Sequence, residues 1–76
     1  MDFVALLEQA GLRVVNGHHR VQAALSYGLE IMAFDAEGSV YRIVMKDNSL
    51  VVEEVSDQQV DGSMLIVEPT EPKAIH

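Results

Sequence analysis

Apolar residues near the start of the chain repeat with the spacing of a helix. Four of them stand at positions i, i+3, i+4 and i+7 and so share one face: Phe3, Leu6, Leu7 and Ala10. Asp2 has a side chain suited to capping the first turn, and Gly11 follows where a helix would stop. The pattern predicts a helix over residues 2–10.

After Gly28 the pattern changes to short apolar runs separated by polar turns. The runs cover residues 29–34, 40–45, 50–55 and 64–67, and turns fall at 36–39 and 46–49. Runs of this length, joined by turns of about four residues, are typical of strands in an antiparallel meander. Residues 12–15 form a further short run with β propensity.

Residues 18–27 fit either a helix or a returning strand. Asn16-Gly17 between two apolar runs is a strong hairpin signal. Three apolar residues of the segment nevertheless share one helix face, the segment is rich in good helix formers, and Gly28 supplies a stop. We favour the helix.

Together these elements predict the α+β class, with one or two short helices packed on a three- to four-stranded, mainly antiparallel sheet. Residues 1–67 would form a single small domain, and residues 68–76, which hold both prolines, a C-terminal tail. A chain of 76 residues without cysteine buries a small core and has no disulfide to stabilise it. We therefore expect a homodimer.

The chain is acidic, with 12 Asp and Glu residues against 5 Lys and Arg residues and a formal net charge of −7. Nucleic acids and anionic membrane surfaces attract basic proteins, so we expect neither as a direct partner. The first ten residues have no basic, apolar leader, and no stretch reaches the ~20 apolar residues of a membrane span. The sequence thus predicts a soluble, cytoplasmic protein.

The segment from Asn16 to Arg20, Asn-Gly-His-His-Arg, carries the residues best suited to hold an anion. If a helix starts after Gly17, its first N–H groups point outward at the positive end of the helix dipole. Gly17 has no Cβ to obstruct a ligand. Arg20 offers a fork of donors suited to phosphate, and His18 or His19 can add another. These five residues are our candidate phosphate-binding site.

Residues 15–29 resemble the conserved box of the ParB/sulfiredoxin-like superfamily. Members of that group carry a strand, a Gly-x-His-Arg or Gly-His-His-Arg sequence, and a helix with Ala-Ala before a Gly-Leu pair. The matching positions here are Gly17 to Arg20, Ala23-Ala24 and Gly28-Leu29. The resemblance implies a bound nucleotide, CTP or ATP, with residues 17–20 on its phosphates. Sulfiredoxins have a catalytic Cys where this chain has His18, and the chain has no Cys, which excludes that reductase chemistry.

The C-terminal half supports an alternative function. Residues 46–76 carry 7 acidic and 2 basic groups, which indicates a surface able to meet a basic partner protein. The chain would then be a non-catalytic protein-binding module or inhibitor, of the kind that small phage proteins provide as nucleic-acid mimics. Its partner-binding residues would be Glu53, Glu54, Asp57 and Asp61. A third interpretation stays open, in which Asn16-Gly17 is a plain turn and the acidic face a solvated sheet edge.

No constellation in the sequence predicts catalysis or a metal site. Glu53 and Glu54 are neighbours on a predicted strand and point to opposite faces, so they cannot act together on one substrate. His18 and His19 would point about 100° apart on a helix, with no further His or Cys at ligand spacing. We expect a protein that is not an enzyme and that binds no metal.

Overall fold

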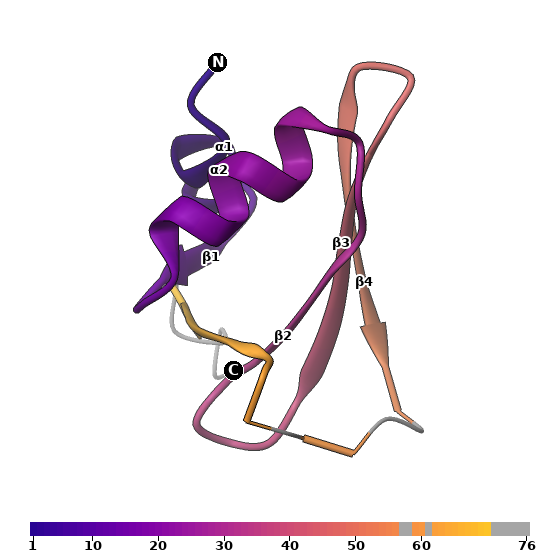
Figure 1. Ribbon diagram of the computed structural model, residues 1–76. Coiled ribbons are helices and arrows are strands. Elements are labelled where there is room, and N and C mark those ends of the chain that lie inside the picture. The colour runs from indigo at the N-terminus through magenta and orange to yellow at the C-terminus, as the bar shows by residue number, and fades with distance from the viewer. Residues whose placement is uncertain (57–58, 61, 71–76) are drawn as a thin grey trace, which may run out of the picture.

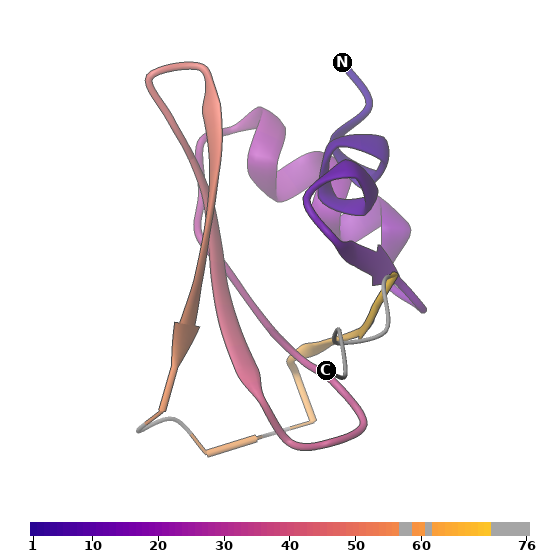
Figure 2. The ribbon, with the colours of Figure 1, turned by 180° about the vertical axis from the view of Figure 1, so that it is seen from behind.

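A computed structural model of the chain describes residues 1–56, 59–60 and 62–70. Within them the chain forms two helices and five strands, in the order α1 (Phe3–Gln9), β1 (Leu12–Val14), α2 (His18–Ser26), β2 (Ile31–Phe34), β3 (Val40–Lys46), β4 (Ser49–Val55) and β5 (Leu65–Pro69). Figures 1 and 2 show the two helices together on one side of the molecule and the long β3–β4 hairpin on the other. The fold is α+β, as the sequence predicts.

The five strands form one sheet in the order β1-β5-β2-β3-β4. Three of its four pairings are antiparallel, and the fourth, between β2 and β5, is parallel. The sheet is therefore larger than the three to four strands predicted, and it is mixed. The β propensity of residues 12–15 was visible in the sequence, but periodicity does not reveal that β5 inserts between β1 and β2 and so joins β1 to the sheet.

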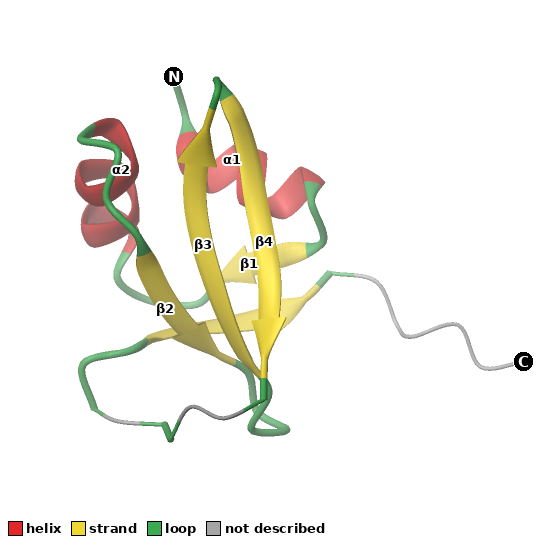
Figure 3. Cartoon of the chain, turned by 90° about the vertical axis from the view of Figure 1, so that its right-hand side faces the viewer, coloured by secondary structure: helices red, strands yellow, loops and turns green. Residues whose placement is uncertain are grey.

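The helices pack on one face of the sheet, and this contact forms the hydrophobic core (Figure 3). Two residues from each helix and seven from the strands make up the buried cluster: Phe3, Leu7, Val21, Leu25, Leu12, Val14, Ile31, Ala33, Ile43, Leu65 and Val67. Side chains alternate between the two faces of a strand, so in β1 Leu12 and Val14 are buried while Arg13 is exposed. The buried side chains of both helices pack against the buried side of the strands, and this contact sets the position of each helix over the sheet.

The helix predicted over residues 2–10 is present as α1, and its predicted cap is confirmed. Asp2 is the N-cap, and its Oδ1 accepts a hydrogen bond from the Ala5 N–H at 3.1 Å. The segment after Gly17 is the helix α2 and not a returning strand. Within the described residues, neither helix has the length and apolar character needed to cross a membrane.

The β3–β4 turn is tighter than the four-residue turn predicted at 46–49. Lys46 and Ser49 pair as strand residues, and only Asp47 and Asn48 lie between them. These two residues have positive φ angles of 52° and 64°. Two residues in this conformation form the type of hairpin turn that matches the twist of the strands, and Asp and Asn tolerate it better than other residues with a side chain.

β5 also extends beyond the predicted strand at 64–67. It includes Glu68 and Pro69, and the Thr70 N–H donates to the Gly11 carbonyl at 2.9 Å. The first residues of the predicted tail are thus paired with β1, where Leu12 lies opposite Pro69. Residues 71–76 lie outside the described part of the chain.

Candidate phosphate-binding site

Gly17 joins β1 to α2 in a conformation that favours glycine. Its φ is +81°, in the left-handed region, and it occupies the N-cap position of α2. A Cβ placed on Gly17 would lie 2.3 Å from Leu65 Cδ2, closer than side chains approach one another. The residue is therefore required both for the turn and for the contact between the turn and β5.

Two hydrogen bonds hold the turn against β5. The Val15 N–H donates to the Ile66 carbonyl at 2.8 Å, and the Ile66 N–H donates to Asn16 Oδ1 at 3.4 Å. The Asn16 side chain, predicted to contact phosphate, thus uses its oxygen to position the turn. This explains how the sequence fixes the start of α2 relative to the sheet.

The first turn of α2 presents N–H groups that the helix itself cannot use. The Val21 N–H donates to the Gly17 carbonyl at 3.1 Å, which is the first hydrogen bond of the helical pattern. The N–H groups of residues 18–20 precede it and have no helical carbonyl one turn earlier. Gly17 has no side chain to cap them. They lie at the positive end of the helix dipole, where a negative charge is stabilised by about 0.3–1 kcal/mol.

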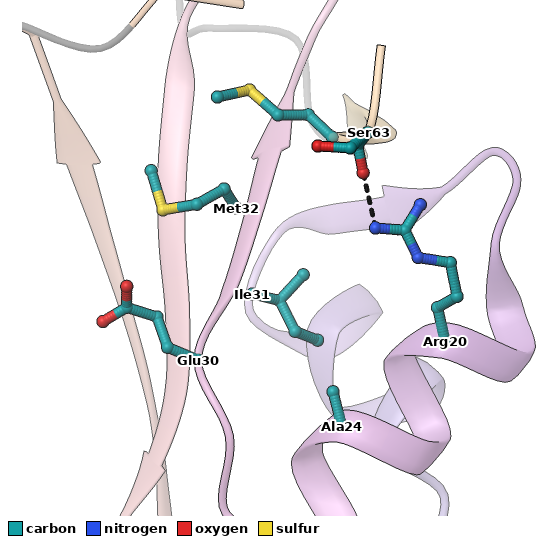
Figure 4. Close-up of a pocket in the computed structure, with 7 residues that line it drawn as sticks. Arg20, Ala24, Glu30, Ile31, Met32 and Ser63 are labelled. Atoms are coloured by element: carbon teal, nitrogen blue, oxygen red, sulfur yellow. Dashed lines mark hydrogen bonds between the residues drawn. The ribbon is translucent and has the colours of Figure 1, made fainter. Parts of the chain in front are cut away.

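Arg20 extends from this first turn toward the segment that precedes β5. Its Nη2 donates to the Ser63 carbonyl oxygen at 2.5 Å, across 43 positions of sequence. Figure 4 shows the guanidinium reaching away from the helix to this carbonyl. A guanidinium has five N–H donors, so one bond to Ser63 leaves others for a ligand.

The other two arginines of the chain are engaged by carboxylates. Arg13 pairs with Glu68, and Arg42 pairs with Glu53 at 2.6 Å and with Glu30 at 3.8 Å. Arg20 instead donates to a neutral carbonyl, and no described carboxylate forms an ion pair with it. Its positive charge is therefore available to an anion.

The two histidines of the segment are exposed residues at the start of α2. They are adjacent on the helix and so point in different directions. Their backbone N–H groups belong to the open first turn, whichever way the rings point. Among the described residues, no group of three or more His, Cys, Asp or Glu side chains is arranged to hold a metal ion.

A pocket of about 300 Å³ lies beside Arg20, between α2, the start of β2 and the residues that precede β5. Seven residues line it: Arg20, Ala24, Glu30, Ile31, Met32, Ser63 and Met64. Arg20 and Ala24 are one helical turn apart and so share a side of α2. Figure 4 shows Arg20 and Glu30 on opposite sides of Ile31. The pocket therefore has the positive group of Arg20 on the α2 side, while the Glu30 carboxylate extends to the other side of β2, toward Arg42.

The predicted acidic surface is only partly within the described structure. Glu53 and Glu54 are exposed on β4, and they face opposite sides of the sheet as successive strand residues do. Glu53 Oε2 accepts a hydrogen bond from Arg42 Nη2 at 2.6 Å. Asp57 and Asp61 lie outside the described residues. The two described carboxylates, Glu53 and Glu54, therefore do not share one patch.

Sequence reasoning located the start of α2 but missed the pocket beside it. Two signals exist in the sequence: Arg20 and Ala24 have i, i+4 spacing, and Glu30 interrupts an apolar run. Ser63 and Met64 could not be found this way. They reach the pocket because β5 pairs in parallel with β2, a contact between distant segments that no local pattern predicts.

Comparison with known proteins gives no match: no protein-family model, no curated protein and no solved structure is significantly similar to this chain. The likeness of residues 15–29 to the ParB/sulfiredoxin-like box therefore rests on those residues alone. What the site binds has to be inferred from its geometry and chemistry.

Proposed function

We propose that this chain is a phosphate-binding module of the ParB-like kind, whose ligand is a nucleotide such as CTP or ATP held at the start of α2. One observation carries the proposal. Arg20, the arginine without a described carboxylate partner, stands in the same helical turn as the open N–H groups of residues 18–20. A phosphate at this position would accept hydrogen bonds from the backbone and from the guanidinium together.

Each residue of the site has a defined role in this proposal. Gly17 supplies the left-handed turn from which the helix starts, and the backbone N–H groups of His18 and His19 donate to phosphate oxygens. Arg20 adds a bidentate donor and the charge that balances the phosphate. Asn16 acts indirectly, by holding the turn to Ile66 of β5. The net charge of −7 opposes anion binding at long range, so the local geometry has to supply the affinity.

The proposal is tested by thermal unfolding with pyrophosphate, ATP and CTP, with and without magnesium. A ligand present at 100 times its Kd stabilises the folded state by about 2.7 kcal/mol. For a chain this small, that corresponds to a rise in Tm of about 10–20 °C. We expect a rise of this order with at least one of the three ligands.

Arg20→Ala and Arg13→Ala form a matched pair of variants. Both remove an exposed arginine, but Arg13 pairs with Glu68 on the sheet and lies outside the first turn of α2. Arg20→Ala also loses the bond to Ser63, so the ligand-induced rise is compared and not the starting Tm. We expect the rise to vanish in Arg20→Ala and to persist in Arg13→Ala. An equal rise in both variants, or no rise with any ligand in the unaltered chain, contradicts the proposal.

The acidic protein-binding alternative remains a prediction from charge. In the described structure Glu53 is already engaged by Arg42, and Glu54 lies on the opposite face of β4. No geometric observation favours this function over phosphate binding.

A further inference from the structure

The outer edge of β4 is long and regular. β4 has seven residues and lies at the outside of the sheet, where among the described strands it pairs with β3 alone (Figure 1). Each residue from Ser49 to Val55 has its own partner on β3, so no bulge interrupts the strand. The strand also contains no proline. Two of the features that protect sheet edges from pairing with another chain, a bulge and a proline, are therefore absent from β4.

The hairpin turn determines which backbone groups of β4 face this edge. Lys46 and Ser49 flank a two-residue turn, so the Ser49 N–H is directed toward β3. In an antiparallel pair, residues directed toward the partner strand alternate with residues directed away from it. Residues 49, 51, 53 and 55 therefore direct their N–H and C=O groups toward β3. The N–H and C=O groups of Leu50, Val52 and Glu54 point outward, toward the edge of the sheet.

A second copy of β4 can satisfy all of these outward groups in one register only. If two copies run antiparallel about a two-fold axis at Val52, Val52 faces its equivalent and Leu50 faces Glu54 of the other copy. Each outward N–H then meets an outward C=O of the second copy. An axis at Val51 leaves Glu54 without such a partner, and an axis at Glu53 leaves Leu50 without one. A shift by a single residue places outward groups opposite inward ones.

The charges of β4 favour the same register. In it Glu54 faces Leu50 and Glu53 faces Val51, so no carboxylate lies directly opposite another. An axis at Glu53 would instead place two Glu53 side chains directly opposite, where like charges are destabilising. Within its own chain, Glu53 is already paired with Arg42 at 2.6 Å. The two glutamates therefore disfavour a competing register and not the pairing of the strands itself.

We propose that two copies of this chain join their sheets through β4, as antiparallel strands about a two-fold axis at Val52. Residues that face one another in an antiparallel pair have their side chains on the same face of the sheet. The axis is therefore perpendicular to the sheet, and the helices of both copies cover one face of a continuous sheet. The homodimer expected from the sequence thereby gains a defined interface. This inference goes beyond the proposed phosphate site and does not depend on it.

Cross-linking tests the register, because the chain has no cysteine and a single introduced thiol reports where two copies meet. In Val52→Cys the two thiols would face each other, with Cα atoms about 5.5 Å apart, a separation that a disulfide can span. In Glu54→Cys, on the same face of β4, the two Cα atoms would be about 14 Å apart, too far for a disulfide. We expect air oxidation to link Val52→Cys into a dimer and to leave Glu54→Cys unlinked. Equal linking of both variants, or linking of Glu54→Cys alone, overturns the register.

Amide hydrogen exchange tests the interface in the unaltered chain, so the result does not depend on whether a cysteine variant folds. In the dimer the N–H groups of Leu50, Val52 and Glu54 are hydrogen-bonded across the edge. Those of Val51 and Glu53 are bonded to β3 with or without a second copy and serve as the internal control. At millimolar concentration we expect the three edge groups to exchange as slowly as the control pair. Exchange about tenfold or more faster than the control pair overturns the proposal.

Glu54→Pro assigns the protection to the second copy. Proline removes the outward N–H of residue 54, which β3 does not use, and proline is tolerated on an edge strand in that position. We expect exchange at Leu50 and Val52 to become at least about tenfold faster in this variant, while the control pair stays protected. Unchanged protection of Leu50 and Val52 in Glu54→Pro would show that something other than a second β4 covers the edge, and would overturn the interface.

Discussion

Gly17 and Leu65 are in such close contact that a Cβ on the glycine would lie 2.3 Å from Leu65 Cδ2. Leu65 is the first residue of β5, and Gly17 is the N-cap of α2. The start of the helix therefore rests directly on a strand that is formed far away in the sequence. This contact fixes how far the backbone N–H groups of residues 18–20, at the start of α2, lie from the sheet.

Gly17→Ala is expected to destabilise the protein by more than the same substitution at Gly38. Both glycines have positive φ, +81° and +88°, so each alanine pays a conformational cost of about 1–2 kcal/mol. A Cβ at Gly38 meets nothing within 4 Å, whereas one at Gly17 collides with Leu65. Urea unfolding at equilibrium measures the loss in free energy of unfolding for each of the two variants. Equal losses would show that Leu65 yields without cost and that the contact does not constrain the turn.

A buried carboxylate organises the turn between β2 and β3. Asp35 is 4% exposed. Its Oδ1 accepts from the N–H groups of Glu37 and Ser39 at 2.9 and 3.0 Å, and its Oδ2 accepts from the Tyr41 hydroxyl at 2.8 Å. Burial, reinforced by the hydrogen bond to Asp35 and by its charge, raises the pKa of Tyr41 from 10.0 to about 12.

This raised pKa predicts a loss of stability at alkaline pH. The folded state holds the Tyr41 proton more tightly than the unfolded chain does. The resulting stabilisation is therefore complete below pH 10 and is lost as the pH rises through about 12. Tyr41→Phe should cost about 1.5–3 kcal/mol at neutral pH, because it removes a hydrogen bond to a buried carboxylate. The difference between this variant and the unaltered chain should shrink above pH 10, as measured by urea unfolding across that range.

Tyr27→Phe is the control for this effect, because Tyr27 is 80% exposed. Its difference from the unaltered chain should stay constant over the same pH range. If the difference for Tyr41→Phe also stayed constant, the Tyr41–Asp35 bond would not be the source of the pH dependence.

Gln22 ties the N-terminal segment to α2. Its Oε1 accepts from the Phe3 N–H at 3.0 Å and its Nε2 donates to the Met1 carbonyl at 2.6 Å. Gln22→Ala should loosen α1 and destabilise the protein by about 1–2 kcal/mol, since the Phe3 N–H loses its partner. Hydrogen exchange at the backbone N–H of Phe3 should become faster in the same variant. Gln9→Ala, at an exposed position of α1, should leave both quantities unchanged, and unchanged exchange at Phe3 in Gln22→Ala would refute the link.

The expected homodimer has a candidate interface at the edge of the sheet. β4 has seven residues and, among the described strands, is paired on one side only, by β3. Exposed strand edges of this length favour association with a second chain. We expect light scattering to give the mass of a dimer at micromolar concentrations and Glu54→Pro to give that of a monomer. A monomer mass for the unaltered chain contradicts the prediction.

Local patterns predicted most of the helices and strands closely, because the spacing of apolar residues within an element and the polar residues at its ends lie next to one another in the sequence. The spacing of Phe3, Leu6 and Leu7 marks α1, and polar turns mark the limits of β3 and β4. The candidate site was accessible for the same reason: strand, Gly17 and helix are consecutive in the sequence. The arrangement of the sheet was not accessible. The hydrogen bond between Arg20 and Ser63 forms only because β5 inserts between β1 and β2. The position of β5 is set by contacts between residues that are distant in the sequence.

The position of β5 has a consequence for how the protein is made. β5 lies between β1 and β2, so the strand that completes the sheet is also the one synthesised after all the others described. Until it leaves the ribosome, α1, β1 and α2 have no strand joining them to the β2–β4 meander. Contacts this distant in sequence slow folding, because a long loop must close before they form. The chain should therefore complete its fold, and with it the candidate site at the start of α2, after synthesis has passed Pro69, in a single late step and not progressively from its N-terminus.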